Sequence, residues 1–205
     1  MKTIETIIFD LGGVLIDWNP KYVYREVFNG DEEKVDWFLD NICNFDWNVE
    51  QDAGRTFEDA TQILISQYPQ YEEWIRIFYD RWEDMLGGPI QDSVLLLNKL
   101  KKANTHQLYA LTNWSAEAFP VAIQRYDFLE HFEGILVSGE EKMRKPFAKI
   151  YELMLDRYKL NAEKSVFIDD NLDNVLGAKK VGMKAIQYKN SQQLINELNH
   201  LGVCF

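Results

Sequence analysis

Polar side chains stand at four points where the sequence predicts the end of a strand or the start of a helix. These are Asp10, Thr112-Asn113, Lys145 and Asp169-Asp170. A carboxylate such as Asp10 can attack phosphorus and form an aspartyl-phosphate, which water then hydrolyses. The covalent intermediate replaces one difficult displacement with two easier ones. This set of residues therefore predicts phosphoryl transfer with Asp10 as the nucleophile.

A metal ion is expected beside Asp10, because the nucleophile and a phosphate group are both negative. Mg²⁺ is bound in such sites by one or two carboxylates together with carbonyl, phosphate and water oxygens. Asp169 and Asp170 would repel each other without a cation or strong donors nearby. Since neighbouring side chains diverge, we assign direct coordination to Asp170 and a supporting role to Asp169. The alternative is that the pair caps a helix over 174–181.

The phosphate itself is expected near Thr112, Asn113 and Lys145. A helix beginning near Ser115 would point its N-terminus at the same space, where free N–H groups and the helix dipole favour anions. Pro146 suits the first turn of a following helix, which would hold the Lys145 ammonium near the edge of the sheet. Taken alone, Thr112-Asn113 is more often a capping pair than a binding site.

The elements that must position these residues alternate between strands and helices. Short apolar runs occur at 4–9, 108–111, 134–137, 166–168 and 184–188, and helical patterns lie between them at 91–103, 115–126, 147–158, 174–181 and 191–200. This alternation predicts an α/β fold, a three-layer Rossmann-like core with a mostly parallel sheet and helices on both faces. Ligands of such sheets bind beyond the carboxyl ends of the strands.

The interval 17–88 breaks this alternation and looks entirely helical. Asn19-Pro20, Asp31 and Thr56 each start a helix, and Tyr71, Trp74, Ile75 and Phe78 repeat at helical spacing in a fourth. Five of the six tryptophans lie in this interval, which favours a small helical bundle with its own core. We therefore predict a core of residues 1–16 and 89–205 with a helical cap of 17–88, hinged near Gly12-Gly13 and Gly87-Gly88.

The charge of the chain is uneven. The net charge is −11, and residues 17–88 hold 17 Asp and Glu against 6 Lys and Arg. An anionic surface disfavours nucleic acid and membrane partners, so a small phosphorylated metabolite is the expected ligand and the oligomeric state stays open. Cys43 and Cys204 predict neither a disulfide nor a zinc site. With no long apolar run and no signal-peptide pattern at the start, a cytoplasmic protein is expected.

The four groups also lie in motifs that resemble those of the haloacid-dehalogenase-like hydrolase superfamily. The matching stretches begin at Phe9, Leu111, Met143 and Phe167, and run as FDLGGVL, LTNWS, MRKPFAKIY and FIDDNLDNVLGAKKVG. The resemblance implies Asp10 as nucleophile, Thr112 and Asn113 as phosphate ligands, and Lys145 as the charge-balancing lysine. It also implies Mg²⁺ on Asp10, the Gly12 carbonyl and Asp170, support from Asp169 and Asn174, and a helical (C1-type) cap.

One position departs from the family pattern. Most phosphatases of this superfamily carry a second Asp two residues after the nucleophile, which protonates the leaving oxygen, but Gly12 stands there. Such acid–base catalysis typically contributes about 10²–10⁴-fold, so a leaving group that departs easily is expected. The residues of these motifs resemble those of a bacterial branch of the superfamily that is active on α-D-glucose 1-phosphate. A hexose phosphate is therefore the first substrate that we expect. Asp17 is the first candidate for a replacement proton donor.

Two other readings stay open at this point. A 2-haloacid dehalogenase uses the same Asp nucleophile on carbon and needs no metal, but Asp169-Asp170 would then place needless negative charge beside the substrate. A catalytically weak binding or regulatory protein could keep the fold after losing the acid expected at Gly12. The joint presence of Asp10, Lys145 and Asp170 favours the enzyme.

Overall fold

A five-stranded parallel sheet forms the centre of the computed structural model, which describes residues 3–204. The strands are β1 (Thr6–Phe9), β4 (Gln107–Thr112), β5 (Gly134–Val137), β6 (Ser165–Asp169) and β7 (Lys184–Gln187). Their order across the sheet is β5-β4-β1-β6-β7, and every neighbouring pair is parallel. The predicted α/β fold with a mostly parallel sheet is confirmed.

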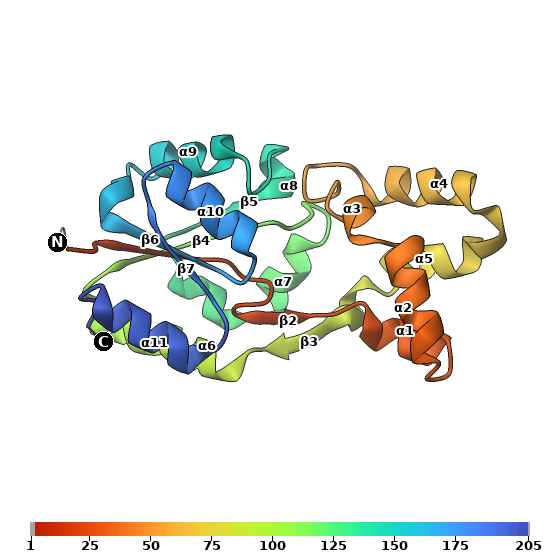
Figure 1. The fold of residues 1–205 in the computed structure, drawn as a ribbon, viewed down its shortest axis with the longest axis horizontal. Coiled ribbons are helices and arrows are strands. Elements are labelled where there is room, and N and C mark those ends of the chain that lie inside the picture. Colours follow the sequence, from red (N-terminus) through yellow and green to blue (C-terminus); the bar gives the residue numbers. More distant parts are fainter. Residues whose placement is uncertain (1–2, 205) are drawn as a thin grey trace.

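Helices cover both faces of this sheet (Figure 1). Successive residues of a strand point to opposite faces, so Ile7 and Phe9 pack in one apolar cluster while Ile8 packs in another. The first cluster includes side chains of α6 (Gln91–Ala103), α7 (Phe119–Arg125) and α11 (Ser191–His200), and the second those of α9 (Ala148–Arg157) and α10 (Leu172–Lys180). Because both faces are buried, the central strands read as continuous apolar runs.

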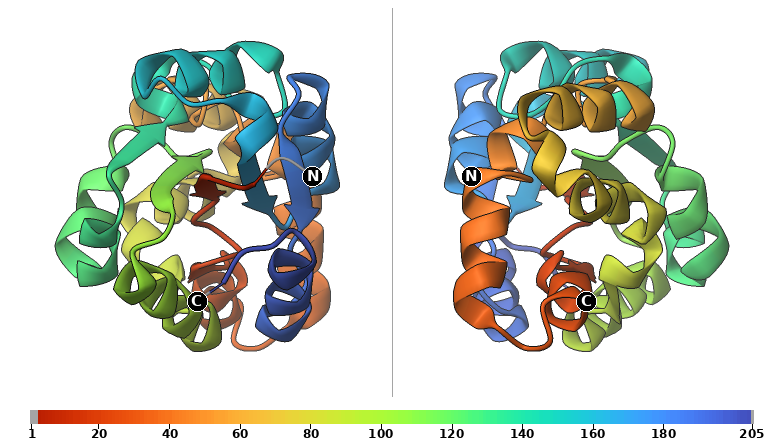
Figure 2. Two further views of the ribbon diagram at one scale, coloured as in Figure 1. Left: turned by 90° about the vertical axis from the view of Figure 1, so that its left-hand side faces the viewer. Right: turned by 90° about the vertical axis from the view of Figure 1, so that its right-hand side faces the viewer.

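A group of helices stands beyond the carboxyl ends of the strands and faces the viewer in the right-hand view of Figure 2. It contains α1 (Lys21–Val27), α2 (Glu32–Asn41), α3 (Phe45–Asn48), α4 (Phe57–Gln67) and α5 (Glu72–Asp80). Two predicted N-caps are confirmed, since Asp31 accepts from the Lys34 N–H at 3.1 Å and Thr56 accepts from the Asp59 N–H at 3.0 Å. The predicted start at Asn19-Pro20 is shifted by one residue: Pro20 is the N-cap of α1, and Asn19 Oδ1 accepts the Lys21 N–H at 2.9 Å. We call this group the cap.

The sequence predicted that the interval 17–88 is entirely helical, and this prediction is wrong. β2 (Ile16–Trp18) and β3 (Leu86–Pro89) form an antiparallel ribbon that connects the cap to the sheet. Strands this short carry no readable periodicity. Gly87 leaves room in the ribbon for the Asp17 side chain, because an added Cβ would lie 2.2 Å from Asp17 Oδ2. The division of the chain at 16/17 and 88/89 therefore falls within the ribbon, and the domain limits stay a prediction.

The aromatic side chains of the cap pack on one another, as between Tyr24 and Phe38, whose ring centroids lie 4.9 Å apart. However, the apolar cluster that holds them continues into the sheet face lined by Phe9. Trp82 and Trp114 make one such connection, with ring centroids 5.7 Å apart. The predicted separate core of the cap is thus joined to the main core.

Two further helix starts differ from the prediction. The segment after β4 turns before it becomes helical, so α7 begins at Phe119 rather than near Ser115. Pro146 lies before the N-cap of α9, outside the helix. The remaining short elements are α8 (Ser138–Glu141), η1 (Pro69–Tyr71), η2 (Trp82–Met85), η3 (Asp127–His131) and η4 (Ala162–Lys164). Within residues 3–204, no helix has the length and apolar character needed to cross a membrane.

Candidate active site

The candidate residues come together because β4, β1 and β6 are adjacent and parallel. Asp10 follows β1, Asn113 follows β4, and Asp169-Asp170 lie at the end of β6. The same ends open into a cavity of about 610 Å³ between the sheet and the cap, lined by Asp10, Gly12, Asn113, Lys145 and Asp170 among others. Parallel strands bring their carboxyl ends to one edge, so sequence neighbours of the strand ends become spatial neighbours.

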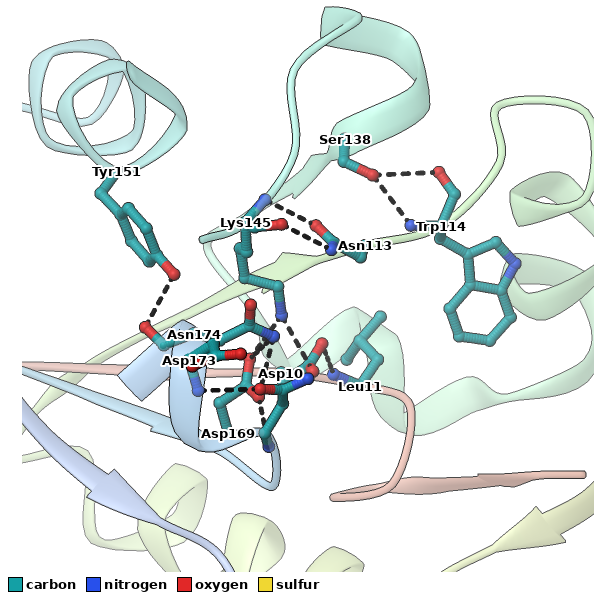
Figure 3. Close-up of polar contacts among 11 residues, drawn as sticks. Asp10, Leu11, Asn113, Trp114, Ser138, Lys145, Tyr151, Asp169, Asp173 and Asn174 are labelled. Atoms are coloured by element: carbon teal, nitrogen blue, oxygen red, sulfur yellow. Dashed lines mark hydrogen bonds and ion pairs between the residues drawn. The ribbon is translucent and has the colours of Figure 1, made fainter. Parts of the chain in front are cut away.

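Lys145 reaches between two carboxylates at the base of this cavity (Figure 3). Its Nζ lies 2.9 Å from Asp10 Oδ2 and 2.6 Å from Asp169 Oδ2, and its side chain is fully buried. Burial alone would lower the pKa of the Lys145 ammonium, but the charges of Asp10 and Asp169 outweigh burial and raise it. Lys145 therefore stays charged and ties the ends of β1 and β6 together.

Asp169 is saturated with donors. Besides Lys145, it accepts the Asn171 N–H at 2.8 Å. It also accepts the Asn174 side-chain amide at 3.1 Å, as Figure 3 shows. The side chain that caps α10 is Asn171, which accepts the Asp173 N–H at 2.8 Å. The alternative reading of the Asp pair as a helix cap is therefore wrong, and α10 begins at Leu172, before the predicted 174.

Three carboxylates lie close enough to share one cation. Ligand oxygens of Asp10, Asp169 and Asp170 are all within 4.8 Å of one another. One ammonium, that of Lys145, faces three acids, so negative charge is in excess. Burial raises the pKa of the Asp10 carboxyl well above its usual range, Lys145 lowers it, and Asp169 raises it further. A divalent cation fits this donor set, since it would neutralise the surplus charge and keep the nucleophile ionised.

Gly13 makes room for the Asp170 carboxylate. Its φ of +72° is in the left-handed region, and a Cβ added there would lie 2.6 Å from Asp170 Oδ2. Gly12, by contrast, has no left-handed φ, and an added Cβ would meet no atom within 4 Å. Of the two glycines, Gly13 is the one required by the backbone and by the contact with Asp170.

We expect Gly13→Ala to weaken Mg²⁺ binding strongly and Gly12→Ala to weaken it little. The added methyl group at position 13 must displace the Asp170 carboxylate, whereas at position 12 it enters open space. Isothermal titration with Mg²⁺ would measure both, with circular dichroism as the folding control. Equal Mg²⁺ affinities of the two variants would contradict this assignment.

Thr112 is the last residue of β4 and Asn113 follows it, and the two side chains have different surroundings. The Asn113 side chain is already engaged with the main chain of Lys145: its Oδ1 accepts the Lys145 N–H at 2.9 Å and its Nδ2 donates to the Lys145 carbonyl at 3.1 Å. Its side-chain amide therefore positions the lysine, and the role of Asn113 as a phosphate ligand stays a prediction. The Thr112 hydroxyl is fully buried and has no hydrogen-bond partner in the described part of the chain. Thr112 thus retains a free polar group beside the site.

Sequence reasoning missed Asp52, a partly buried acid of the cap that lines the same cavity. Nothing in the sequence separates it from the other 16 acidic residues of the cap interval. Asp17, the earlier candidate for a proton donor, accepts from the Tyr22 hydroxyl at 2.5 Å and packs against Gly87 in the ribbon. Because Asp17 is not among the residues lining the cavity, that expectation is wrong.

Comparison with known proteins agrees with this geometry. A family model described as haloacid dehalogenase-like hydrolase matches residues 7–188. The chain is 30% identical over 203 residues, 98% of each chain, to a sesquiterpene phosphatase of Aspergillus oryzae. It is 24% identical to a phosphorylated carbohydrates phosphatase of Thermotoga maritima, covering 89% of this chain and 84% of that one. A Bacteroides thetaiotaomicron enzyme solved with magnesium and inorganic phosphate superimposes with a TM-score of 0.66 at 24% identity, over 91% of this chain and 94% of that one.

Proposed function

Because the chain belongs to the haloacid dehalogenase-like hydrolases, we propose that it is a magnesium-dependent phosphatase of small organic phosphate monoesters. The observation that carries the proposal is the cluster of Asp10, Lys145, Asp169 and Asp170 at the base of one cavity. Phosphoryl transfer through an aspartyl-phosphate needs a carboxylate nucleophile, a positively charged group such as the buried Lys145 ammonium, and further carboxylates that can hold a metal ion.

Each residue then has one task. Asp10 attacks phosphorus, Lys145 balances the charge of the phosphate oxygens, and the unpartnered Thr112 hydroxyl donates to one of them. Asp10, Asp170 and the Gly12 carbonyl would hold Mg²⁺, which supplies positive charge beside the phosphate. Asn174 and Lys145 fix Asp169, and Asp169 in turn holds the Lys145 ammonium against Asp10.

The cap side of the cavity favours an apolar leaving group over the hexose expected from the sequence. The lining from this side is mainly apolar and aromatic: Trp18, Leu39, Phe45, Val49, Phe57, Phe78, Tyr79 and Trp82. Several of its polar side chains are already paired. Gln51 donates to the Tyr79 hydroxyl and accepts from Arg55 Nε at 2.7 Å, and Asn44 accepts the Trp47 N–H at 2.9 Å.

A hexose would bury several hydroxyl groups against this lining, and a buried hydroxyl without a partner costs about 1–3 kcal/mol. An apolar alcohol has no such cost and gains from burial of its carbon chain. The Aspergillus relative is named for a sesquiterpene substrate. A terpenoid or other apolar alcohol phosphate is therefore our leading substrate class, and α-D-glucose 1-phosphate is the second candidate.

The metal requirement is tested with Asp170→Asn. Activity should vanish in EDTA and return with Mg²⁺, and the variant should need far more Mg²⁺ for half-maximal rate, because one charged ligand is lost. Asp173→Asn, a change of an exposed acid beside the site, is the matched control and should keep an apparent Mg²⁺ affinity close to that of the wild type. Full activity in EDTA would contradict the metal proposal and favour the dehalogenase chemistry.

The substrate class is tested by comparing kcat/KM for farnesyl phosphate and α-D-glucose 1-phosphate. We expect the apolar ester to be preferred. Replacing Phe57, a cavity-lining aromatic residue, with Asn should reduce that preference. A preference for the sugar ester would instead support the second candidate, and no turnover of either, or of other phosphate monoesters, would refute the phosphatase.

A further inference from the structure

Position 12 lacks the acid that would protonate the leaving alcohol, although a side chain there would find open space. A leaving alkoxide still needs a proton, because expulsion of an unprotonated alkoxide is slow. The acid must therefore come from another residue whose side chain reaches the cavity. Asp52 is a cap residue that fits this requirement, and the inference below rests on the phosphatase function proposed above.

The loop that carries Asp52 is fastened to the core on both sides of it. Arg144 Nη2 lies 3.4 Å from Glu50 Oε1, and the Phe57 N–H donates to Glu117 Oε1 at 2.8 Å. Between these contacts, Gly54 approaches the core so closely that a Cβ would lie 3.2 Å from the Gly139 carbonyl oxygen. These contacts hold the loop over the cavity, so the position of Asp52 is set by packing rather than by its own hydrogen bonds.

The Asp52 carboxyl has no hydrogen-bond or ion-pair partner in the described part of the protein. It lies in the same cavity as Asp10 and Lys145. Two positively charged residues nearby, Lys145 and Arg144, interact with it electrostatically. The Lys145 ammonium is committed to Asp10 and Asp169, and the Arg144 guanidinium contacts Glu50. A cavity-lining acid without a partner is available to substrate.

From this geometry we infer that Asp52 is the proton donor of the reaction, delivered to the cavity by the cap in place of an acid at position 12. In the first step, Asp10 attacks phosphorus, the bond from phosphorus to the alcohol oxygen breaks, and that oxygen takes the Asp52 proton. In the second step, water attacks the aspartyl-phosphate and gives its proton to the Asp52 carboxylate. The bond to Asp10 breaks, phosphate leaves, and Asp52 is protonated again.

The surroundings of Asp52 suit this role. Burial raises the pKa of its carboxyl to about 7, while Lys145 and then Arg144 lower it. The Tyr79 hydroxyl also interacts with Asp52, and its own pKa is raised by burial and by the Asp52 charge. An acid with a pKa near neutrality can both give and recover a proton at physiological pH.

The test compares the first turnover of two esters by wild type and Asp52→Asn. One is p-nitrophenyl phosphate, whose leaving group departs as a phenolate without being protonated. The other is 3-phenylpropyl phosphate, whose alkoxide must be protonated as it leaves. Rapid quench would measure the release of each alcohol. For Asp52→Asn, release of phenylpropanol should fall by about 10²–10⁴-fold, while release of nitrophenolate should be little changed.

The pH dependence of the first-turnover rate is a second readout, and it would not change if the role of Asp52 were merely structural. In the wild type, the first-turnover rate for the phenylpropyl ester should fall as pH rises through the donor's pKa, because the proton is lost. The nitrophenyl ester should lack this alkaline decline. Asp52→Glu should retain part of the alkyl rate, and adding Gly12→Asp to Asp52→Asn should restore part of it, since that position can receive a side chain.

Asp46→Asn is the matched control, an exposed cap acid in α3 that does not line the cavity, and it should leave both esters unaffected. An equal loss with both esters in Asp52→Asn would assign Asp52 a merely structural role and overturn the inference. An unchanged alkyl rate would overturn it as well. If the wild type cleaves neither ester, the proposed phosphatase function is refuted together with this inference. If the wild type is active but Asp52→Asn shows either of the two results above, only the role of Asp52 is refuted.

Discussion

Replacing Asp10 with Asn should reduce phosphatase activity to background, a loss on the order of 10⁶-fold, as for the removal of other covalent nucleophiles. The amide keeps the shape of the carboxylate but cannot attack phosphorus. Lys145 keeps its ion pair with Asp169, and one of three crowded acids disappears, so the free energy of unfolding should not decrease. The measurement is kcat with an aryl phosphate, together with urea unfolding.

A second readout addresses the covalent step directly. Acid-quenched wild-type protein should carry one phosphoryl group during turnover, detectable by mass spectrometry, and Asp10→Asn should carry none. Asp92→Asn, a change of an exposed acid in the first turn of α6, serves as the control and should retain full activity. Near-normal turnover by Asp10→Asn in a preparation free of other phosphatases would refute the nucleophile.

Replacing Lys145 with Met should destabilise the protein and also remove activity. The side chain keeps much of its length, but Asp10 and Asp169 lose the cation between them. Removing one partner of a buried ion pair costs about 3–5 kcal/mol, because the remaining charge is left uncompensated. We expect a decrease of this size in the free energy of unfolding in EDTA, and a smaller decrease in Mg²⁺, which supplies positive charge to the same carboxylates.

The pH dependence of this effect has a definite sign. Without Lys145 the pKa of the Asp10 carboxyl, already raised by burial, rises further above its unfolded value, so the destabilisation is present at high pH. It decreases as pH falls through the folded pKa of Asp10, because protonation removes the uncompensated charge. Lys149→Met, a change of an exposed lysine of α9, should alter the free energy of unfolding by less than about 0.5 kcal/mol. Equal unfolding of the two variants at pH 8 in EDTA would contradict the role of Lys145.

The fold and the position of the candidate site were largely predictable from the sequence. The central strands β1, β4 and β6 are fully or almost fully buried, so they appear as nearly continuous apolar runs, and helices of readable period lie between the strands. Once the sheet is parallel, the residues after β1, β4 and β6 must share one edge. Local order in the chain therefore predicted that Asp10, Asn113 and Asp170 would meet.

Other features depend on contacts that no local pattern encodes. The short ribbon of β2 and β3 pairs residues about 70 positions apart, and three or four residues carry too little periodicity to be read. The late start of α7 follows from the turn at 116–118 after β4. The roles of Gly12 and Gly13 also look alike in the sequence, and only the packing of Asp170 against Gly13 separates them.

The sequence by itself determined at which edge of the sheet Asp10, Asn113 and Asp170 lie, because strand and helix periods follow from local burial. Tertiary structure decided how those residues are used. It engaged the Asn113 amide with the Lys145 main chain, turned Asp17 into the ribbon, and brought Asp52 from the cap to the cavity. Side-chain partners across a cavity depend on the packing of distant segments, and 17 acidic residues of one interval cannot be told apart until that packing places one of them over the site.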